Sequence, residues 1–285
     1  MMPTLAIAAK TNFLNIENSS CAETSKCNRL QMKCNRFHFV VKALLEAGWD
    51  VIATMRTPRP ELLPNTEKLK TLALDVTSDE SITKAVEAAG EIDALVNNAG
   101  VGMLNVLEGS EMSKVRDLFE TNLFGVIAMT KAVLPQMRKR GAGMIVNVSS
   151  SVTIKPLPAL SVYSASKAAL NAFTESLALE AALFGVRVRL VLPGSAPSTA
   201  LGKNAVARMG MDIPAPYETF VHDYLAKLRA GTVVTTAEDV AQAIMRAVTD
   251  PDAPMKIAAG ADAQTLFRAA GQAESQSVVG ASGHE

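Results

Sequence analysis

Tyr163 and Lys167 are the residues of this sequence whose types and spacing point most directly to chemistry. In the segment Tyr163-Ser164-Ala165-Ser166-Lys167, a spacing of four places the phenol and the ammonium on the same helical face. A free tyrosine has a pKa of about 10 and is a poor base at neutral pH, but a neighbouring cation favours the phenolate and lowers that pKa. The pair therefore predicts acid–base chemistry. The alternative interpretation is a solvated pair on a helix surface.

Ser150 is a second candidate for the same chemistry. It follows the apolar run 144–148, which predicts a strand leading into a loop at the carboxyl edge of a parallel sheet. Ligands of open α/β sheets bind at that edge. The Ser150 hydroxyl and the Tyr163/Lys167 pair can therefore meet at one substrate carbonyl group.

The elements that would position these side chains follow an alternating pattern. Between about residues 41 and 259, short runs rich in Val, Ile and Leu alternate with longer stretches of helical period, which is typical of repeated β-α-β units. Predicted strands lie near 51–55, 71–74, 94–97, 144–148 and 187–192. Predicted helices end near 47, begin after 78, run from 113 toward 141, and cover about 163–183 and 236–248. The pattern indicates an α/β fold with a parallel sheet.

Several motifs occur together in an order that resembles the short-chain dehydrogenase/reductase family. They are Asn97-Asn98-Ala99-Gly100, Ser150 and Tyr163-Ser164-Ala165-Ser166-Lys167, accompanied by Asp75, Asn122 and Pro193-Gly194. The resemblance covers about residues 42–262. It implies a single domain with a doubly wound, Rossmann-like parallel sheet in a three-layer αβα arrangement, and a nicotinamide-dependent oxidoreductase.

The resemblance also implies a role for each catalytic residue. Tyr163 would donate or accept the substrate proton, and Lys167 would lower the pKa of Tyr163 and hold the nicotinamide ribose. Ser150 would orient the substrate carbonyl, and Asn122 would support a water-linked proton relay. Because the cofactor carries the hydride, the protein's part is positioning and electrostatics.

Cofactor contacts are expected at several strand ends. Asn98, Ala99 and Gly100 follow a buried strand, where a glycine permits close backbone approach to a ribose or phosphate. An ordinary turn would explain this tetrapeptide equally well. By resemblance, Asn97 ties neighbouring strands together. The other positions implied for cofactor binding are Asp75, Val76, Tyr163, Lys167, Pro193, Gly194 and Ser198.

Arg56 favours NADP over NAD. It follows the predicted strand 51–55, and no acidic residue stands at that strand end, where an NAD enzyme would bind the ribose 2′-hydroxyl. A guanidinium can instead form paired hydrogen bonds with a 2′-phosphate.

The sequence departs from the family pattern at its start. The family's glycine-rich turn should precede the first helix, yet the first glycine of the chain is Gly48. Counting back from Gly48 places the glycine positions near Gln31, Asn35 and Phe37, whose side chains would crowd a pyrophosphate.

A smaller departure follows Pro193-Gly194. The family's threonine comes one place late here, at Thr199, so Ser198 is expected to replace it, and Pro197 removes one backbone donor from the loop.

These patterns predict a division of the chain into segments. The first strand would come from residues 4–9 or 37–41, or be missing. Residues 1–36 are an atypical leader, for which disorder is one interpretation, and 37–262 form the Rossmann-like domain, with a lid at about 195–235. Residues 263–285 are small and polar and are expected to form a flexible tail.

Composition excludes some partners. Lys plus Arg and Asp plus Glu both number 28, without a basic block, which disfavours nucleic-acid binding. Apolar runs are too short for a membrane span. Cys21, Cys27 and Cys34 lack the paired spacing of a metal site and are interpreted as reduced thiols of a cytoplasmic protein.

Three functions remain open. The first is an NADP(H)-dependent oxidoreductase acting on a small or medium apolar alcohol or ketone. The second is a catalytically impaired binding or scaffold protein that has lost dinucleotide binding, and the third is an epimerase or dehydratase, for which too little chain follows the sheet. The apolar substrate is suggested by lid residues that could equally belong to the core: Met209, Met211, Tyr217, Phe220 and Tyr224. A homodimer or homotetramer is expected from the family.

Overall fold

A parallel sheet forms the centre of the protein. The computed structural model describes residues 11–15, 36–195, 213–230 and 234–281. Among these residues, seven strands pair in the order β3-β2-β1-β4-β5-β6-β7, and every pairing is parallel. The strands are β1 (Thr11–Asn15), β2 (Asp50–Met55), β3 (Leu69–Ala73), β4 (Ala94–Asn97), β5 (Gly143–Val148), β6 (Val186–Pro193) and β7 (Lys256–Ala259). The predicted α/β fold class is confirmed.

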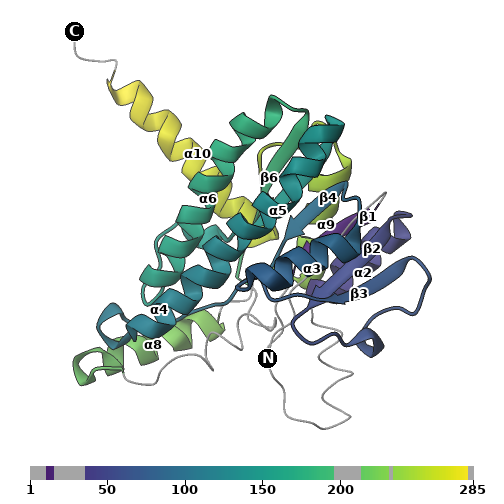
Figure 1. Cartoon of the computed structure of the whole chain (residues 1–285). Helices are drawn as coiled ribbons and strands as arrows, with labels where there is room; N and C mark the ends of the chain where they lie inside the picture. The colour runs from purple at the N-terminus through teal and green to yellow at the C-terminus, as the bar shows by residue number, and fades with distance from the viewer. Residues whose placement is uncertain (1–10, 16–35, 196–212, 231–233, 282–285) are drawn as a thin grey trace.

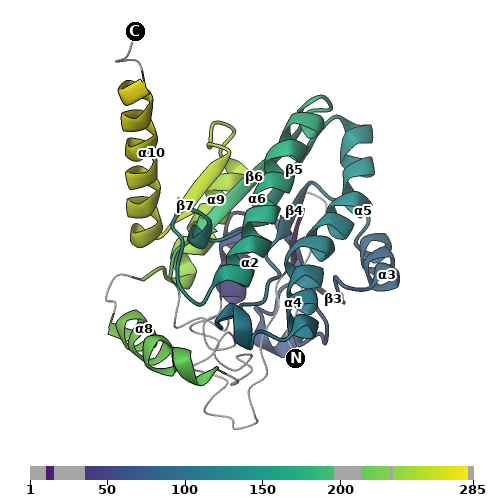
Figure 2. The ribbon, with the colours of Figure 1, turned by 90° about the vertical axis from the view of Figure 1, so that its left-hand side faces the viewer.

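Helices cover both faces of the sheet (Figures 1 and 2). Helices α3 (Asp79–Ala89), α5 (Gly125–Arg140) and α6 (Ser161–Ala182) lie on one face, and α2 (Arg36–Glu46) packs against α9 (Ala237–Thr249) on the other. The remaining helical elements are α4 (Met112–Phe119), the π-helical η3 (Glu120–Phe124), α8 (Glu218–Ala230), α10 (Ala261–Ala281) and the short turns η1 (Pro60–Leu62), η2 (Leu107–Gly109), η4 (Ser151–Thr153) and η5 (Ala215–Tyr217). This is the expected three-layer arrangement.

Local sequence signals set several helix ends. Ser78 caps α3 by accepting a hydrogen bond from the Ser81 N–H at 3.3 Å. Thr236 and Asp239 form a reciprocal capping box at the start of α9. Gly48 follows α2 with a φ of +87°, a conformation that L side chains rarely adopt.

The start of the sheet differs from two of the sequence-based alternatives. Residues 37–41 are helical and lie in α2, so their assignment as the first strand is wrong. Their apolar residues recur at helical spacing, which buries Phe37, Val40 and Val41 in the main core. The first strand is also not missing, because β1 pairs with β4 from Asn12 opposite Ala94 to Asn15 opposite Asn97. The third alternative, residues 4–9, lies outside the described residues.

The segment boundaries expected from the sequence stay predictions, but the structure adds two elements to them. Strand β1 lies inside the expected leader 1–36. Helix α10 extends to Ala281, so much of the expected tail 263–285 is helical, and it projects away from the sheet (Figures 1 and 2). None of the described helices combines the length and apolar character that a membrane crossing requires.

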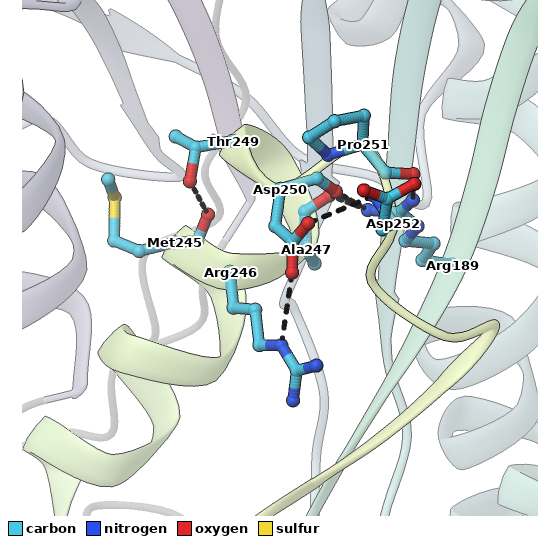
Figure 3. Close-up of polar contacts among 8 residues, drawn as sticks. All are labelled: Arg189, Met245, Arg246, Ala247, Thr249, Asp250, Pro251 and Asp252. Atoms are coloured by element: carbon cyan, nitrogen blue, oxygen red, sulfur yellow. Dashed lines mark hydrogen bonds and ion pairs between the residues drawn. The ribbon is translucent and has the colours of Figure 1, made fainter.

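Arg189 joins strand β6 to the end of helix α9 (Figure 3). Its side chain is buried, and its guanidinium donates to the carbonyl oxygens of Ala247 at 3.0 Å, of Pro251 at 2.6 Å and of Asp250. These carbonyls lie at and just beyond the C-terminus of α9, where a cation is favoured. Burial, and secondarily the nearby Arg187, lower the pKa of Arg189 from its ordinary value.

Candidate active site

The side chains singled out by the sequence gather at one edge of the sheet. Because all strand pairings are parallel, their carboxyl ends share that edge. Asn98 to Gly100 follow β4, Ser150 follows β5 and Gly194 follows β6. Arg56 follows β2 and Asp75 follows β3, on the far side of β1. The arrangement suits a ligand that extends across several strand ends.

Tyr163 and Lys167 are enclosed by the protein rather than solvated. Tyr163 is 6% exposed and belongs to a small apolar cluster with Val101, Met103 and Leu118. Lys167 is 4% exposed, and its Nζ donates to the Val148 carbonyl oxygen at 3.0 Å. The alternative of a solvated surface pair is therefore wrong. Burying an ammonium costs free energy unless the group is hydrogen-bonded. The hydrogen bond to Val148 offsets part of that cost for Lys167.

Gly100 lies directly against the Lys167 ammonium. A Cβ atom at Gly100 would lie 3.3 Å from Lys167 Nζ and 3.3 Å from Asn122 Oδ1. Both neighbours are already held by hydrogen bonds, so neither can shift freely. The glycine therefore leaves room beside the lysine, on the loop that leaves β4.

Asn122 fastens three parts of the site together. It is fully buried in the π-helical turn between α4 and α5. Its side chain accepts from the Val101 N–H at 2.8 Å, donates to the Val101 carbonyl at 3.0 Å, and donates to Ser166 Oγ at 3.1 Å. Ser166 Oγ in turn donates to the Tyr163 carbonyl at 2.7 Å. Irregular π turns are frequent at functional sites.

Ser150 is positioned by the helix that carries the tyrosine and lysine. Its hydroxyl accepts from the Val152 N–H at 3.4 Å, and its carbonyl accepts from Thr153 Oγ1 at 2.8 Å. Thr153 Oγ1 accepts in turn from Asn171 Nδ2 at 3.0 Å. Asn171 lies on α6, so the Ser150 loop and the Tyr163/Lys167 pair share one support.

A buried amide network lies beneath the site. Asn97 Nδ2 donates to Asn147 Oδ1 at 2.9 Å and to Thr130 Oγ1 at 3.3 Å. Asn147 Nδ2 donates to Thr174 Oγ1 at 2.9 Å. This network joins β4 and β5 to α5 and α6, which confirms the tie between strands expected for Asn97.

Asn98 carries an unsatisfied acceptor that fits a bound dinucleotide. The residue is 7% exposed, and its buried Oδ1 has no hydrogen-bond partner among the described residues. Buried polar atoms are usually paired, so an orphan acceptor beside Gly100 suits the hydroxyl of a ribose. Ala99 is buried, and Gly100 keeps the backbone accessible to such a ligand.

The remaining cofactor candidates lie in different environments. The Asp75 carboxylate closes its own turn by accepting from Thr77 N at 3.0 Å and Thr77 Oγ1 at 2.7 Å. Val76 is buried against Gly125, where a Cβ would come within 2.8 Å of Val76 Cγ2. Arg56 is half-buried. Pro193 is buried at the end of β6, and Ser198 lies outside the described residues.

The expected positions of the missing glycines are only partly described. Gln31 and Asn35 lie outside the described residues, as do the three cysteines. Phe37 packs in the core on α2.

The sequence predicted no role in the site for four residues: Ser166, Asn171, Thr235 and Asp262. Ser166 lies within the motif, and Asn171 lies one helical turn after Lys167, so helical spacing could have found both. Thr235 and Asp262 reach the loop after β6 from distant parts of the chain, and no local pattern marks them.

Residues 38–209 match the sequence model of a protein family described as short chain dehydrogenase. An uncharacterized oxidoreductase, YusZ, from Bacillus subtilis (strain 168) is 39% identical over 67% of this chain and 71% of its own length. Retinol dehydrogenase 8 from Bos taurus is 35% identical over 73% of this chain and 72% of its own length.

Solved structures share the fold. A short-chain dehydrogenase from Streptomyces avermitilis is 29% identical with a TM-score of 0.70, covering 87% of this chain and 92% of its own. A short chain dehydrogenase from Burkholderia cenocepacia J2315, solved in complex with NADP, is 25% identical with a TM-score of 0.65, covering 89% of this chain and 94% of its own.

Proposed function

Because this chain belongs to the short chain dehydrogenase family and is an oxidoreductase, we propose that it transfers a hydride between NADP(H) and an apolar alcohol or ketone. The observation that carries this proposal is the enclosed Tyr163/Lys167 pair beside Gly100, with Ser150 on the same sheet edge. These groups are suited to proton exchange with a substrate oxygen while a nicotinamide lies against the strand ends.

Each residue has a distinct part in the proposed reaction. In the reducing direction, Tyr163 gives its phenolic proton to the substrate oxygen, and in the oxidising direction it accepts that proton. The Lys167 ammonium, oriented by the Val148 carbonyl, stabilises the phenolate left behind. The Ser150 hydroxyl donates to the substrate oxygen and orients the carbonyl. Bound nicotinamide supplies or accepts the hydride.

The Asn122 side chain serves mainly to position the other groups. Its side-chain hydrogen bonds to the described residues go to the loop after β4 and to α6, which fixes Gly100 relative to Lys167. A water-linked proton relay through Asn122 remains part of the proposal.

NADP is the preferred cofactor in this proposal. Arg56 follows β2 without an acidic neighbour at the strand end, which suits a 2′-phosphate. The relative from Burkholderia cenocepacia was solved with NADP. Asn98, Gly100, Lys167 and Gly194 would hold the nicotinamide half.

An apolar substrate is supported by exposed aromatic side chains on and before α8. Tyr217 and Phe220 are exposed, and Phe220 stacks on Tyr224 with ring centroids 6.5 Å apart. Burial raises the pKa of the Tyr224 phenol, so this side chain stays neutral. Met209 and Met211 lie outside the described residues. A relative named retinol dehydrogenase 8 agrees with an apolar alcohol.

Self-association and a cytoplasmic location belong to the same proposal. Leu179 and Leu183 on and just after α6 are 77% and 80% exposed, and Phe124 and Phe184 are also exposed. Such apolar side chains suit burial between two copies of the chain in a homodimer or homotetramer.

A second candidate is a binding or scaffold protein that no longer holds the dinucleotide. It is favoured by one observation, the absence of any glycine before Gly48, where the family places its phosphate-binding turn.

Fluorescence titration of the purified chain with NADPH and NADH separates the two candidates. Binding of NADPH in the micromolar range, tighter than that of NADH, together with NADPH-dependent reduction of apolar ketones, is the expected result. Failure to bind either nucleotide by a chain that unfolds cooperatively would favour the scaffold.

A further inference from the structure

The loop that leaves β6 is held by two residues from distant parts of the chain. The Gly194 N–H donates to Thr235 Oγ1 at 3.0 Å, and the Ser195 N–H donates to the Asp262 carboxylate at 2.6 Å. The Thr235 N–H donates back to the Ser195 carbonyl at 2.7 Å. Residues 195 and 235 are therefore fastened side by side, at the carboxyl ends of β6 and β7.

Asp262 also sets the orientation of the Thr235 hydroxyl. This hydroxyl is fully buried and has one proton, with two acceptors in reach: Asp262 Oδ1 at 2.6 Å and the Ala259 carbonyl at 2.9 Å. The shorter, charge-assisted bond to the carboxylate takes the proton. The oxygen lone pairs of Thr235 are then directed to the Gly194 N–H.

Two glycines make room for this arrangement. A Cβ atom at Gly194 would lie 2.2 Å from both carboxylate oxygens of Asp262. Gly260 has a φ of +92°, and its Cβ would lie 2.1 Å from Thr235 Oγ1. The Asp262 carboxylate thus occupies the space that a side chain at position 194 would fill. The requirement for glycine at both positions is explained by Asp262 and Thr235.

We propose that Asp262 and Thr235 are positioning residues that fix the Gly194-Ser195 backbone for contact with the nicotinamide end of the cofactor. This inference rests on the proposed function, because Gly194 lies on the sheet edge where the dinucleotide is expected. Both side chains bond to backbone groups and to each other, so they act on the cofactor through the loop. Asp262 acts through the positions of its two acceptor oxygens, and its charge only strengthens the hydrogen bonds that they accept.

The shape of Asp262 can be separated from its charge by two substitutions. In Asp262→Asn, the amide oxygen can accept from Ser195 N–H, and the amide nitrogen can donate to Thr235 Oγ1, whose proton then goes to the Ala259 carbonyl. Every backbone donor keeps a partner. In Asp262→Ala, the Ser195 N–H loses its hydrogen-bond acceptor. The Thr235 hydroxyl loses the stronger of its two acceptors and keeps only the Ala259 carbonyl.

The first measurement is the NADPH dissociation constant of each variant, with kcat measured at saturating NADPH. Asp262→Ala is expected to weaken NADPH binding about tenfold while kcat changes less than about threefold. Asp262→Asn and Thr235→Ser should stay within about threefold of the parent chain, and Thr235→Val should resemble Asp262→Ala. Gln264→Ala, an exposed change on the same helix, is the matched control.

The second measurement reports on the loop without any cofactor. Amide hydrogen exchange at Gly194 and Ser195 should accelerate in Asp262→Ala and stay slow in Asp262→Asn and Gln264→Ala. This readout decides the inference even if the parent chain binds no nucleotide, in which case the proposed function alone fails. Unchanged exchange in Asp262→Ala, or an Asp262→Asn variant as impaired as Asp262→Ala, would overturn the inference.

Discussion

The Lys167 ammonium donates to the Val148 carbonyl oxygen at 3.0 Å, which joins helix α6 to the last residue of strand β5. This contact links the two elements that carry the proposed chemistry, because Ser150 lies two residues beyond Val148 and Tyr163 lies one turn before Lys167. The hydrogen bond orients a charge that would otherwise be costly to bury. The relative positions of the proposed catalytic side chains are therefore set by a strand end and by the helix packed against it.

Replacing Tyr163 by Phe removes the proposed proton donor and leaves the ring in its apolar cluster. Turnover should fall by about 10²–10⁴-fold, the usual contribution of a positioned acid or base, while NADPH affinity changes little. Single-turnover reduction of a ketone at saturating NADPH measures this. Ser161→Ala, an exposed change at the start of the same helix, is the control and should keep full activity. Equal turnover in Tyr163→Phe and the parent chain would remove Tyr163 from the mechanism.

Gly100→Ala tests the space beside the lysine. The added Cβ would lie 3.3 Å from both Lys167 Nζ and Asn122 Oδ1, tighter than ordinary contact, so one of them must shift. We expect NADPH affinity to fall on the order of tenfold, with a smaller loss of stability. Titration with NADPH and thermal unfolding give the two numbers.

Gly271→Ala is the matched control for Gly100→Ala. A Cβ at Gly271 meets nothing within 4 Å, and the residue lies within α10, where alanine is favoured over glycine. Affinity for NADPH should be unchanged. The same loss of affinity in both variants would show that crowding beside Lys167 is not the cause.

Asn122→Ala tests the fastening of the π turn. It leaves the Val101 N–H and carbonyl without their side-chain partners and removes the donor to Ser166. Buried backbone groups left unpaired in this way should lower the free energy of unfolding by about 2–4 kcal/mol. Urea denaturation measures the change, with the exposed Ser113→Ala on α4 as the control. A loss below about 0.5 kcal/mol would mean that the turn holds without Asn122.

Much of the fold and site could be predicted because the signals are local. Ser78 and Thr236 are N-cap residues whose own side chains mark where α3 and α9 begin. The spacing of Tyr163 and Lys167 corresponds to one helical turn. Asn98, Ser150 and Gly194 also lie at the edge of the sheet that the apolar run before each of them indicates.

The remainder depends on contacts between distant residues. Strand β1 has the sequence Thr-Asn-Phe-Leu-Asn, which shows no apolar run or clear alternation. It forms a strand because it lies between β2 and β4 and pairs with both, which satisfies backbone groups on both of its sides. Asp262 meets Ser195 across 67 positions of the chain, which no local pattern encodes.

Arg189→Gln and Arg187→Gln form a matched pair on strand β6. Arg189 is buried and donates to carbonyls at the end of α9, whereas Arg187, on the same strand face, is exposed. Loss of the guanidinium leaves the carbonyls of Ala247 and Pro251 short of donors and removes a cation from a helix C-terminus. We therefore expect Arg189→Gln to lower the free energy of unfolding by about 2–3 kcal/mol.

The free energy of unfolding of the control, Arg187→Gln, should lie within about 0.5 kcal/mol of that of the parent chain, or slightly above it, because Arg187 disfavours the charged form of Arg189. Urea denaturation of the two variants side by side decides the matter, and equal losses would assign the effect to net charge instead of to the α9 carbonyls.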